Sequence, residues 1–245
     1  MPQSWAMWLA VEGDLRFLSH HETMRAVERS LLRAGLAMRF TQGFHPHPIL
    51  SLACPRPVGV ASDEDLLVVS LEESTTGEEL LEALTPHAPR GMRFLRAAPL
   101  PMGSRPHPHR CWYELPLWPE SFETVGNMLV RWQEADRWPV DRHKPARQHR
   151  RKSRSRRVDL KALVTNLSLQ GRTIRWQQHP QDNLWARPGE VLEMLGLDPQ
   201  ADLARVRRTA VAYQDLPPWG GSTSSNRPTD EDAATNQPDP FADSE

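Results

Sequence analysis

The chain has 245 residues, enough for two domains of about a hundred residues each. Its only cysteines, Cys54 and Cys111, are too few and too far apart in the sequence to predict a disulfide framework or a zinc site. No stretch approaches the roughly 18 apolar residues of a membrane span, so we expect a cytoplasmic protein with no membrane segment.

The net charge of -1 hides an uneven distribution along the chain. Residues 215–245 carry seven acidic residues and one arginine, which leaves 29 basic and 24 acidic residues in the remainder. This C-terminal segment also lacks the apolar content needed to fold. The sequence therefore predicts a basic body with a disordered acidic tail.

Residues 1–103 are predicted to form a first domain. Apolar residues alternate with smaller ones over Trp5–Phe17, which indicates a strand interrupted by a turn at Gly13. Ser19 and Glu22 then have the spacing of a capping box, and Gly35 ends the helix that this box begins. The further predicted elements are strands over Leu36–Thr41, Ile49–Ala53 and Asp65–Leu71, a helix from Ser74 or Thr75 through Leu84, and a strand over Met92–Ala97. The order β-α-β-β-α-β is that of a ferredoxin-like domain.

Residues 110–214 repeat this order more faintly. The predicted elements are a strand over Cys111–Leu117, a helix over Phe122–Ala135, strands near Trp138, within Val158–Leu169 and over Ile174–Gln178, a helix over Pro188–Leu195, and a strand over Arg205–Tyr213. The predicted fold class is therefore α+β, with two tandem ferredoxin-like units and a basic insertion at residues 142–157 in the second unit.

Several segments of the first domain carry a family signature. They are Arg16–Arg25, Glu28–Leu36, Gln42–Pro48 and Pro57–Glu64. Together they resemble the radical-SAM-linked protein family, a domain of unknown function that is fused to, or encoded beside, cobalamin-type radical SAM proteins. The resemblance implies a radical SAM protein as partner. Because two cysteines cannot hold an iron–sulfur cluster of that kind, we predict that this chain carries no such cofactor.

The basic insertion predicts a phosphate-binding segment. It holds nine Lys and Arg residues and no acidic residue, which favours RNA over a solvated loop or a loop neutralised by the acidic tail. RNA is favoured over DNA by analogy with other ferredoxin-like folds. The candidate RNA-binding residues are Arg142, Lys144, Arg147, Arg150, Arg151, Lys152, Arg154, Arg156 and Arg157, with Arg25 and Arg29 on a helix face that is either solvated or a phosphate contact.

The signature loop is the second candidate site. Gly43 permits positive φ, Phe44 can stack on a base, and the side chains of His45 and His47 point the same way on an extended chain. Alternatively, Phe44 fills the core and the two histidines are merely solvated. Pro46 and Pro48 stiffen the loop, and Ser19 and His20 complete the signature set.

His20, His45 and His47 are weak catalytic candidates, as a general acid–base group that forms only if the helix start and the loop converge. No ligand spacing enforces a metal site, and we predict neither metal nor cofactor. The sequence as a whole favours an RNA-binding accessory protein that presents ribosomal or transfer RNA to a partner radical SAM-type enzyme. A metal-independent RNA-processing endonuclease that uses a histidine and a protein-only scaffold are the alternatives.

Overall fold

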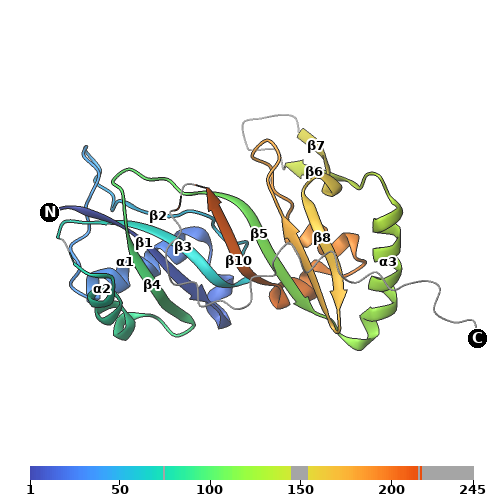
Figure 1. Ribbon diagram of the computed structural model, residues 1–245, viewed down its shortest axis with the longest axis horizontal. Helices are drawn as coiled ribbons and strands as arrows, with labels where there is room; N and C mark the ends of the chain where they lie inside the picture. The colour runs from blue at the N-terminus through green and yellow to red at the C-terminus, as the bar shows by residue number, and fades with distance from the viewer. Residues whose placement is uncertain (74, 145–153, 215, 217–245) are drawn as a thin grey trace, which may run out of the picture.

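The computed structural model describes residues 1–73, 75–144, 154–214 and 216 of a mixed α+β protein with one large sheet and about five helices (Figure 1). The elements of the N-terminal half are β1 (Gln3–Val11), α1 (His20–Arg33), β2 (Leu50–Leu52), β3 (Ala61–Leu71), α2 (Gly77–Leu84) and β4 (Met92–Leu100). Those of the C-terminal half are β5 (His107–Pro116), α3 (Phe122–Glu134), β6 (Pro139–Lys144), β7 (Arg154–Asp159), β8 (Val164–Gln170), β9 (Thr173–Gln178), α4 (Pro188–Met194), α5 (Pro199–Asp202) and β10 (Arg207–Gln214).

A single sheet runs through both halves of the described chain, with the strand order β4-β1-β3-β10-β5-β9-β8 and β2 paired to β3. Neighbouring strands are antiparallel except β3 and β10, which are parallel and pair at Ala61 with Arg207 and at Ser62 with Arg208. The last strand therefore lies between the two halves. Strands β6 and β7 form a separate antiparallel pair.

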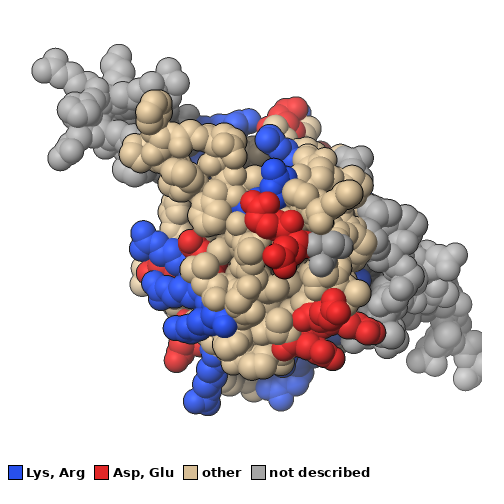
Figure 2. All heavy atoms as spheres, turned by 90° about the vertical axis from the view of Figure 1, so that its left-hand side faces the viewer, with Lys and Arg blue, Asp and Glu red and all other residues tan. Residues whose placement is uncertain are grey.

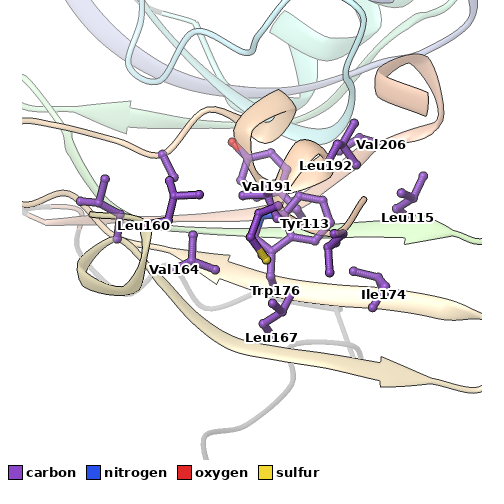
Figure 3. Close-up of a cluster of buried hydrophobic side chains, with 14 of the residues drawn as sticks. Tyr113, Leu115, Leu160, Val164, Leu167, Ile174, Trp176, Val191, Leu192 and Val206 are labelled. Atoms are coloured by element: carbon purple, nitrogen blue, oxygen red, sulfur yellow. The ribbon is translucent and has the colours of Figure 1, made fainter. Parts of the chain in front are cut away.

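Each half has its own core. Alternation along β1 sends Trp5, Met7 and Leu9 toward α1 and α2, while Ala6 and Trp8 belong to a smaller cluster on the other face. In the C-terminal half, Figure 3 shows Tyr113 of β5 beside Trp176 of β9, whose rings stack with centroids 5.3 Å apart. This second core packs against α3 and α4. Strand β10 therefore has a strand of the N-terminal half on one side and a strand of the C-terminal half on the other.

Most predicted elements are present, with local corrections. The strand predicted over Trp5–Phe17 ends at Val11, because a 3-10 turn occupies Gly13–Phe17. The segment Leu36–Thr41 is not a strand and forms only isolated bridges, Met38 to Leu71 and Phe40 to Pro48. Helix α2 is capped by Thr76, whose hydroxyl accepts from Glu79 N, rather than by Thr75. Ser74 and the predicted tail, apart from Leu216, lie outside the described residues.

Candidate functional site

The signature loop presents an unpacked aromatic side chain. The base of the loop is fixed, because Thr41 N donates to His47 O at 2.8 Å and His47 N donates to Thr41 Oγ1 at 3.0 Å. Phe44 is nevertheless 102% exposed, and His45 and His47 are exposed beside it. The loop projects from the N-terminal half between α1 and β2 (Figure 1). The alternative that Phe44 fills the core is therefore wrong.

The start of α1 forms the predicted capping box. Glu22 N donates to Ser19 Oγ at 3.3 Å, and Ser19 N donates to Glu22 Oε2 at 2.8 Å. Partial burial and the neighbouring His21, whose ring centroid lies 5.7 Å away, lower the pKa of His20. In the described part of the chain, no group of three or more His, Cys, Asp and Glu side chains is arranged to hold a metal ion.

The arginines of α1 lie on the surface. Arg25, Arg29 and Arg33 are all exposed and recur at every fourth residue, so they share one side of the helix. Figure 2 views the N-terminal end of the molecule and shows Lys and Arg side chains gathered toward one flank, with most acidic side chains toward the other. This end of the protein therefore carries separated regions of opposite charge.

The basic insertion contains two kinds of arginine. Arg156 and Arg157 on β7 are exposed, whereas Arg142 on β6 is 10% exposed and binds Glu190 through Nε at 2.5 Å and Nη2 at 2.6 Å. Arg142 Nη2 also donates to the carbonyl of Trp185 at 2.6 Å. This side chain attaches the β6–β7 pair to α4 instead of facing solvent. Four of the remaining candidates lie outside the described residues: Arg147, Arg150, Arg151 and Lys152. The other two, Lys144 and Arg154, lie on described strands, but their side chains are outside the description.

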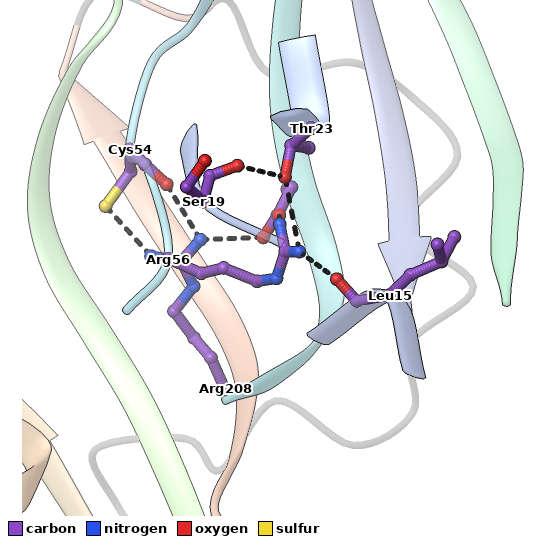
Figure 4. Close-up of polar contacts among 7 residues, drawn as sticks. Leu15, Ser19, Thr23, Cys54, Arg56 and Arg208 are labelled. Carbon is purple, nitrogen blue, oxygen red and sulfur yellow. Dashed lines mark hydrogen bonds and ion pairs between the residues drawn. The ribbon is translucent and has the colours of Figure 1, made fainter. Parts of the chain in front are cut away.

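A buried charged cluster lies where the two halves meet (Figure 4). Asp65 of β3 accepts from Arg208 Nη2 at 2.6 Å and pairs with Arg56 Nη1 at 3.4 Å. The side chains of Arg56, Asp65 and Arg208 are at most 2% exposed. Such desolvated charges are tolerated only when they are paired and hydrogen-bonded, so the cluster depends on its exact geometry.

Two of the signature segments, Arg16–Arg25 and Pro57–Glu64, border this cluster. Arg56 Nη2 donates to Leu15 O at 2.7 Å and to Thr23 Oγ1 at 3.4 Å, which links the cluster to the start of α1. Gly59 N donates to Arg16 O at 2.8 Å, and Arg16 in turn donates to the carbonyl of Ala204, next to β10. Two signature segments that are distant in sequence are thus hydrogen-bonded to each other and to the 3-10 turn that precedes β10.

The two cysteines adjoin the cluster. Cys54 Sγ lies 3.9 Å from Cys111 Sγ of β5, and Arg208 Nη1 donates to Cys54 Sγ at 3.1 Å. The hydrogen bond from Cys111, followed by the charge of Arg208, lowers the pKa of Cys54 to about 7 despite partial burial. The hydrogen bond with Cys54, together with burial, raises the pKa of Cys111.

Both cysteines line a pocket of about 740 Å³ at the junction of the two halves. Its walls are mainly apolar and include Pro55, Pro57, Trp185 and Pro188. Arg208, Arg187 and Gln178 are among its polar groups. Concave apolar sites with a few convergent polar groups are typical ligand sites.

Comparison with known proteins identifies the family. The profile of a family described as "Uncharacterized protein conserved in bacteria (DUF2344)" matches residues 5–192. The chain belongs to this family. The match spans the signature loop, Arg56, Asp65 and both cysteines, while Arg208 lies beyond it.

The chain was also compared with solved structures and with curated proteins. The chain is similar to a protein described as "Crystal Structure of an Unknown Protein from Galdieria sulphuraria", with 13% identity over 73% of this chain and 81% of that one, and a TM-score of 0.25. No curated protein matches the chain. Within the described ranges, no helix is both long and apolar enough to cross a bilayer.

Sequence reasoning missed the buried site of this DUF2344 chain. The distance between Cys54 and Cys111 along the sequence argued against a shared role, yet the sheet brings the two thiols together. Asp65 and Arg208 gave a faint signal, as charged residues within strongly apolar strands. A charge inside such a strand requires a partner, but the sequence does not identify which one.

Proposed function

We propose that this DUF2344 protein binds RNA as an accessory protein, using the signature loop and the exposed basic residues of the insertion. The observation that carries the proposal is Phe44, which is fully exposed at the tip of a loop whose base is fixed by hydrogen bonds. Exposure of the apolar surface of an aromatic ring to water is energetically unfavourable, and stacking on an unpaired base removes that surface from water. His45 and His47 then lie beside the stacked base, and Arg156 and Arg157 supply phosphate contacts.

We also interpret each half as a ferredoxin-like unit. In the N-terminal half the strand order is β4-β1-β3-β2, and in the C-terminal half it is β10-β5-β9-β8, with antiparallel neighbours in both. In each half the third strand lies between the first and the second, and the fourth strand lies beside the first. This is the strand order of a ferredoxin-like β-α-β-β-α-β unit. Ferredoxin-like sheets are a common RNA platform, which supports the proposal by analogy of fold.

The proposed partner is a radical SAM-type enzyme that modifies ribosomal or transfer RNA in the cytoplasm. Support for this part of the proposal comes from the resemblance of the signature segments, including Arg16–Arg25 and Gln42–Pro48, to the radical-SAM-linked family. Mass spectrometry of proteins and RNA recovered with the full chain from native lysate tests it. Recovery of RNA without any radical SAM protein would remove the partner and leave the RNA proposal intact.

Replacing Phe44 by alanine should weaken RNA binding by about 1–3 kcal/mol, because one stacked base is lost. The thermal midpoint should stay unchanged, since the side chain of Phe44 is fully exposed. His45→Ala and His47→Ala should reduce affinity without loss of stability. Filter binding of labelled single-stranded RNA and thermal unfolding, both on the same variants, provide the measurements.

The matched control for this experiment is Trp118→Ala. Trp118 is also an exposed aromatic residue, at 53%, but it lies in the C-terminal half after β5. Equal losses for Phe44→Ala and Trp118→Ala would contradict a specific role for the loop. Cleavage of the RNA, abolished by His20→Ala or a loop histidine variant, would favour the endonuclease, and no retention of RNA at all would favour the scaffold.

A further inference from the structure

The buried cluster lacks one negative charge. Arg56 and Arg208 each contribute a guanidinium, and Asp65 is the only carboxylate that they contact among the described residues. An uncompensated charge in the interior is costly, so a second anion beside the arginines is stabilising. Cys54 is in the right place to provide it, since its sulfur accepts a hydrogen bond from Arg208 at 3.1 Å.

The other ionisable groups that face Cys54 do not provide this charge. Burial raises the pKa of Tyr113 on β5 and of Tyr213 on β10, so both phenols remain neutral. Cys111 also keeps its proton, because its pKa is raised. The pKa of about 7 for Cys54 agrees with the charge count, and at neutral pH a large fraction of the chains combines a Cys54 thiolate with a Cys111 thiol.

The two cysteines differ in exposure and in the backbone structure around them. Cys111 is 1% exposed within β5, whereas Cys54 is partly exposed in the irregular segment that follows β2. Their sulfurs are 3.9 Å apart, against about 2.05 Å in a disulfide, so the two sulfurs must approach by roughly 2 Å to form the bond. Both cysteines line the pocket of about 740 Å³, which is large enough for a small organic disulfide.

We propose that Cys54 and Cys111 form a redox-active dithiol that reduces the disulfide of a small thiol bound in this pocket. The Cys54 thiolate attacks one sulfur of the bound disulfide, which forms a mixed disulfide and releases the first thiolate. The released thiolate or solvent then takes the proton of Cys111, whose sulfur attacks Cys54 Sγ, closes the Cys54–Cys111 bond and releases the second thiolate. The substrate disulfide gains two electrons and the dithiol loses two. This activity is independent of RNA binding.

The test uses the aromatic disulfide dithiobis(nitrobenzoate) on the reduced full-length chain. The wild-type protein should release two nitrothiobenzoate ions per chain and end without an adduct, with a mass lower by two hydrogen atoms. Cys111→Ser should release one ion and keep the adduct on Cys54. Cys54→Ser should react at least tenfold more slowly, because the remaining thiol is buried and protonated.

A wild-type product that carries one or two nitrothiobenzoate adducts would overturn the proposal, since the resolving step would then be missing. So would Cys54→Ser reacting at the wild-type rate. The mass measurement uses only the wild-type chain, so it tests the proposal even if one of the serine variants does not fold. The circular dichroism spectrum of the product, unchanged from that of the reduced chain, should show that the disulfide forms in the folded protein.

Discussion

Replacing Asp65 by asparagine is expected to lower the free energy of unfolding by about 3–5 kcal/mol. The amide removes the carboxylate that pairs with both Arg56 and Arg208, so that among the described residues Arg56 keeps only neutral partners and Arg208 keeps only the sulfur of Cys54 as a possible counter-charge. Because β3 and β10 join the two halves at this point, the loss should affect the whole sheet. Urea unfolding followed by tryptophan fluorescence measures the change.

Asp63→Asn is the matched control for Asp65→Asn. Asp63 also lies on β3 and also pairs with an arginine of β10, Arg207, but both side chains are more than a third exposed. Solvent screens such a pair, so the control should cost no more than about 1 kcal/mol. Similar losses for the two variants, or a loss below about 1 kcal/mol for Asp65→Asn, would show that the buried cluster does not hold the halves together.

The second large effect is on the pH dependence of stability. Folding lowers the pKa of Cys54 from 9.0 to about 7, so the folded chain releases this proton at a pH where the unfolded chain still holds it. Stability from Cys54 should therefore be absent below about pH 7, grow as pH rises, and be complete near pH 9. A difference of two units corresponds to about 2–3 kcal/mol.

The measurement is the free energy of unfolding of the reduced wild-type chain minus that of Cys54→Ser, from pH 6 to pH 9. Histidine titrations are common to both proteins and cancel in this difference. Above pH 9 the raised pKa of Cys111 lowers the free energy of unfolding, because the unfolded chain loses the proton of this thiol at a lower pH than the folded chain does. A difference that is flat, or that falls between pH 7 and pH 9, would show that Cys54 is not a thiolate in the folded state.

Local patterns in the sequence predicted the local structure well. The capping box of Ser19 and Glu22 begins α1 at His20 as expected, because it depends only on residues within one helical turn. The alternation of Trp5, Met7 and Leu9 likewise assigns one face of β1 to the core. The strand predicted over Leu36–Thr41 was wrong, because the segment forms a single bridge to β3, Met38 with Leu71, and β2 pairs with the adjacent residues of β3.

The candidate sites depended on contacts that a local pattern does not contain. The sequence identified Phe44 as a candidate, but it left open whether the ring packs or is exposed. It also grouped Arg142 with the other basic residues, although Glu190, far along the chain, binds that guanidinium. Asp65 and Arg208 are separated by most of the chain and meet only because β10 returns between the halves.

The salt dependence of RNA affinity tests the central claim, RNA binding through the basic insertion, most directly. For the full chain, log affinity for single-stranded RNA should fall linearly with log salt, by about 0.7 for each phosphate contact. Arg156→Gln combined with Arg157→Gln should reduce the magnitude of this slope by about 1.4, because two contacts are lost. Arg142→Gln removes the same kind of charge from a side chain already bound to Glu190, and should leave the slope unchanged. An affinity that does not respond to salt, or equal slopes for the wild type and the Arg156/Arg157 variant, would contradict the account.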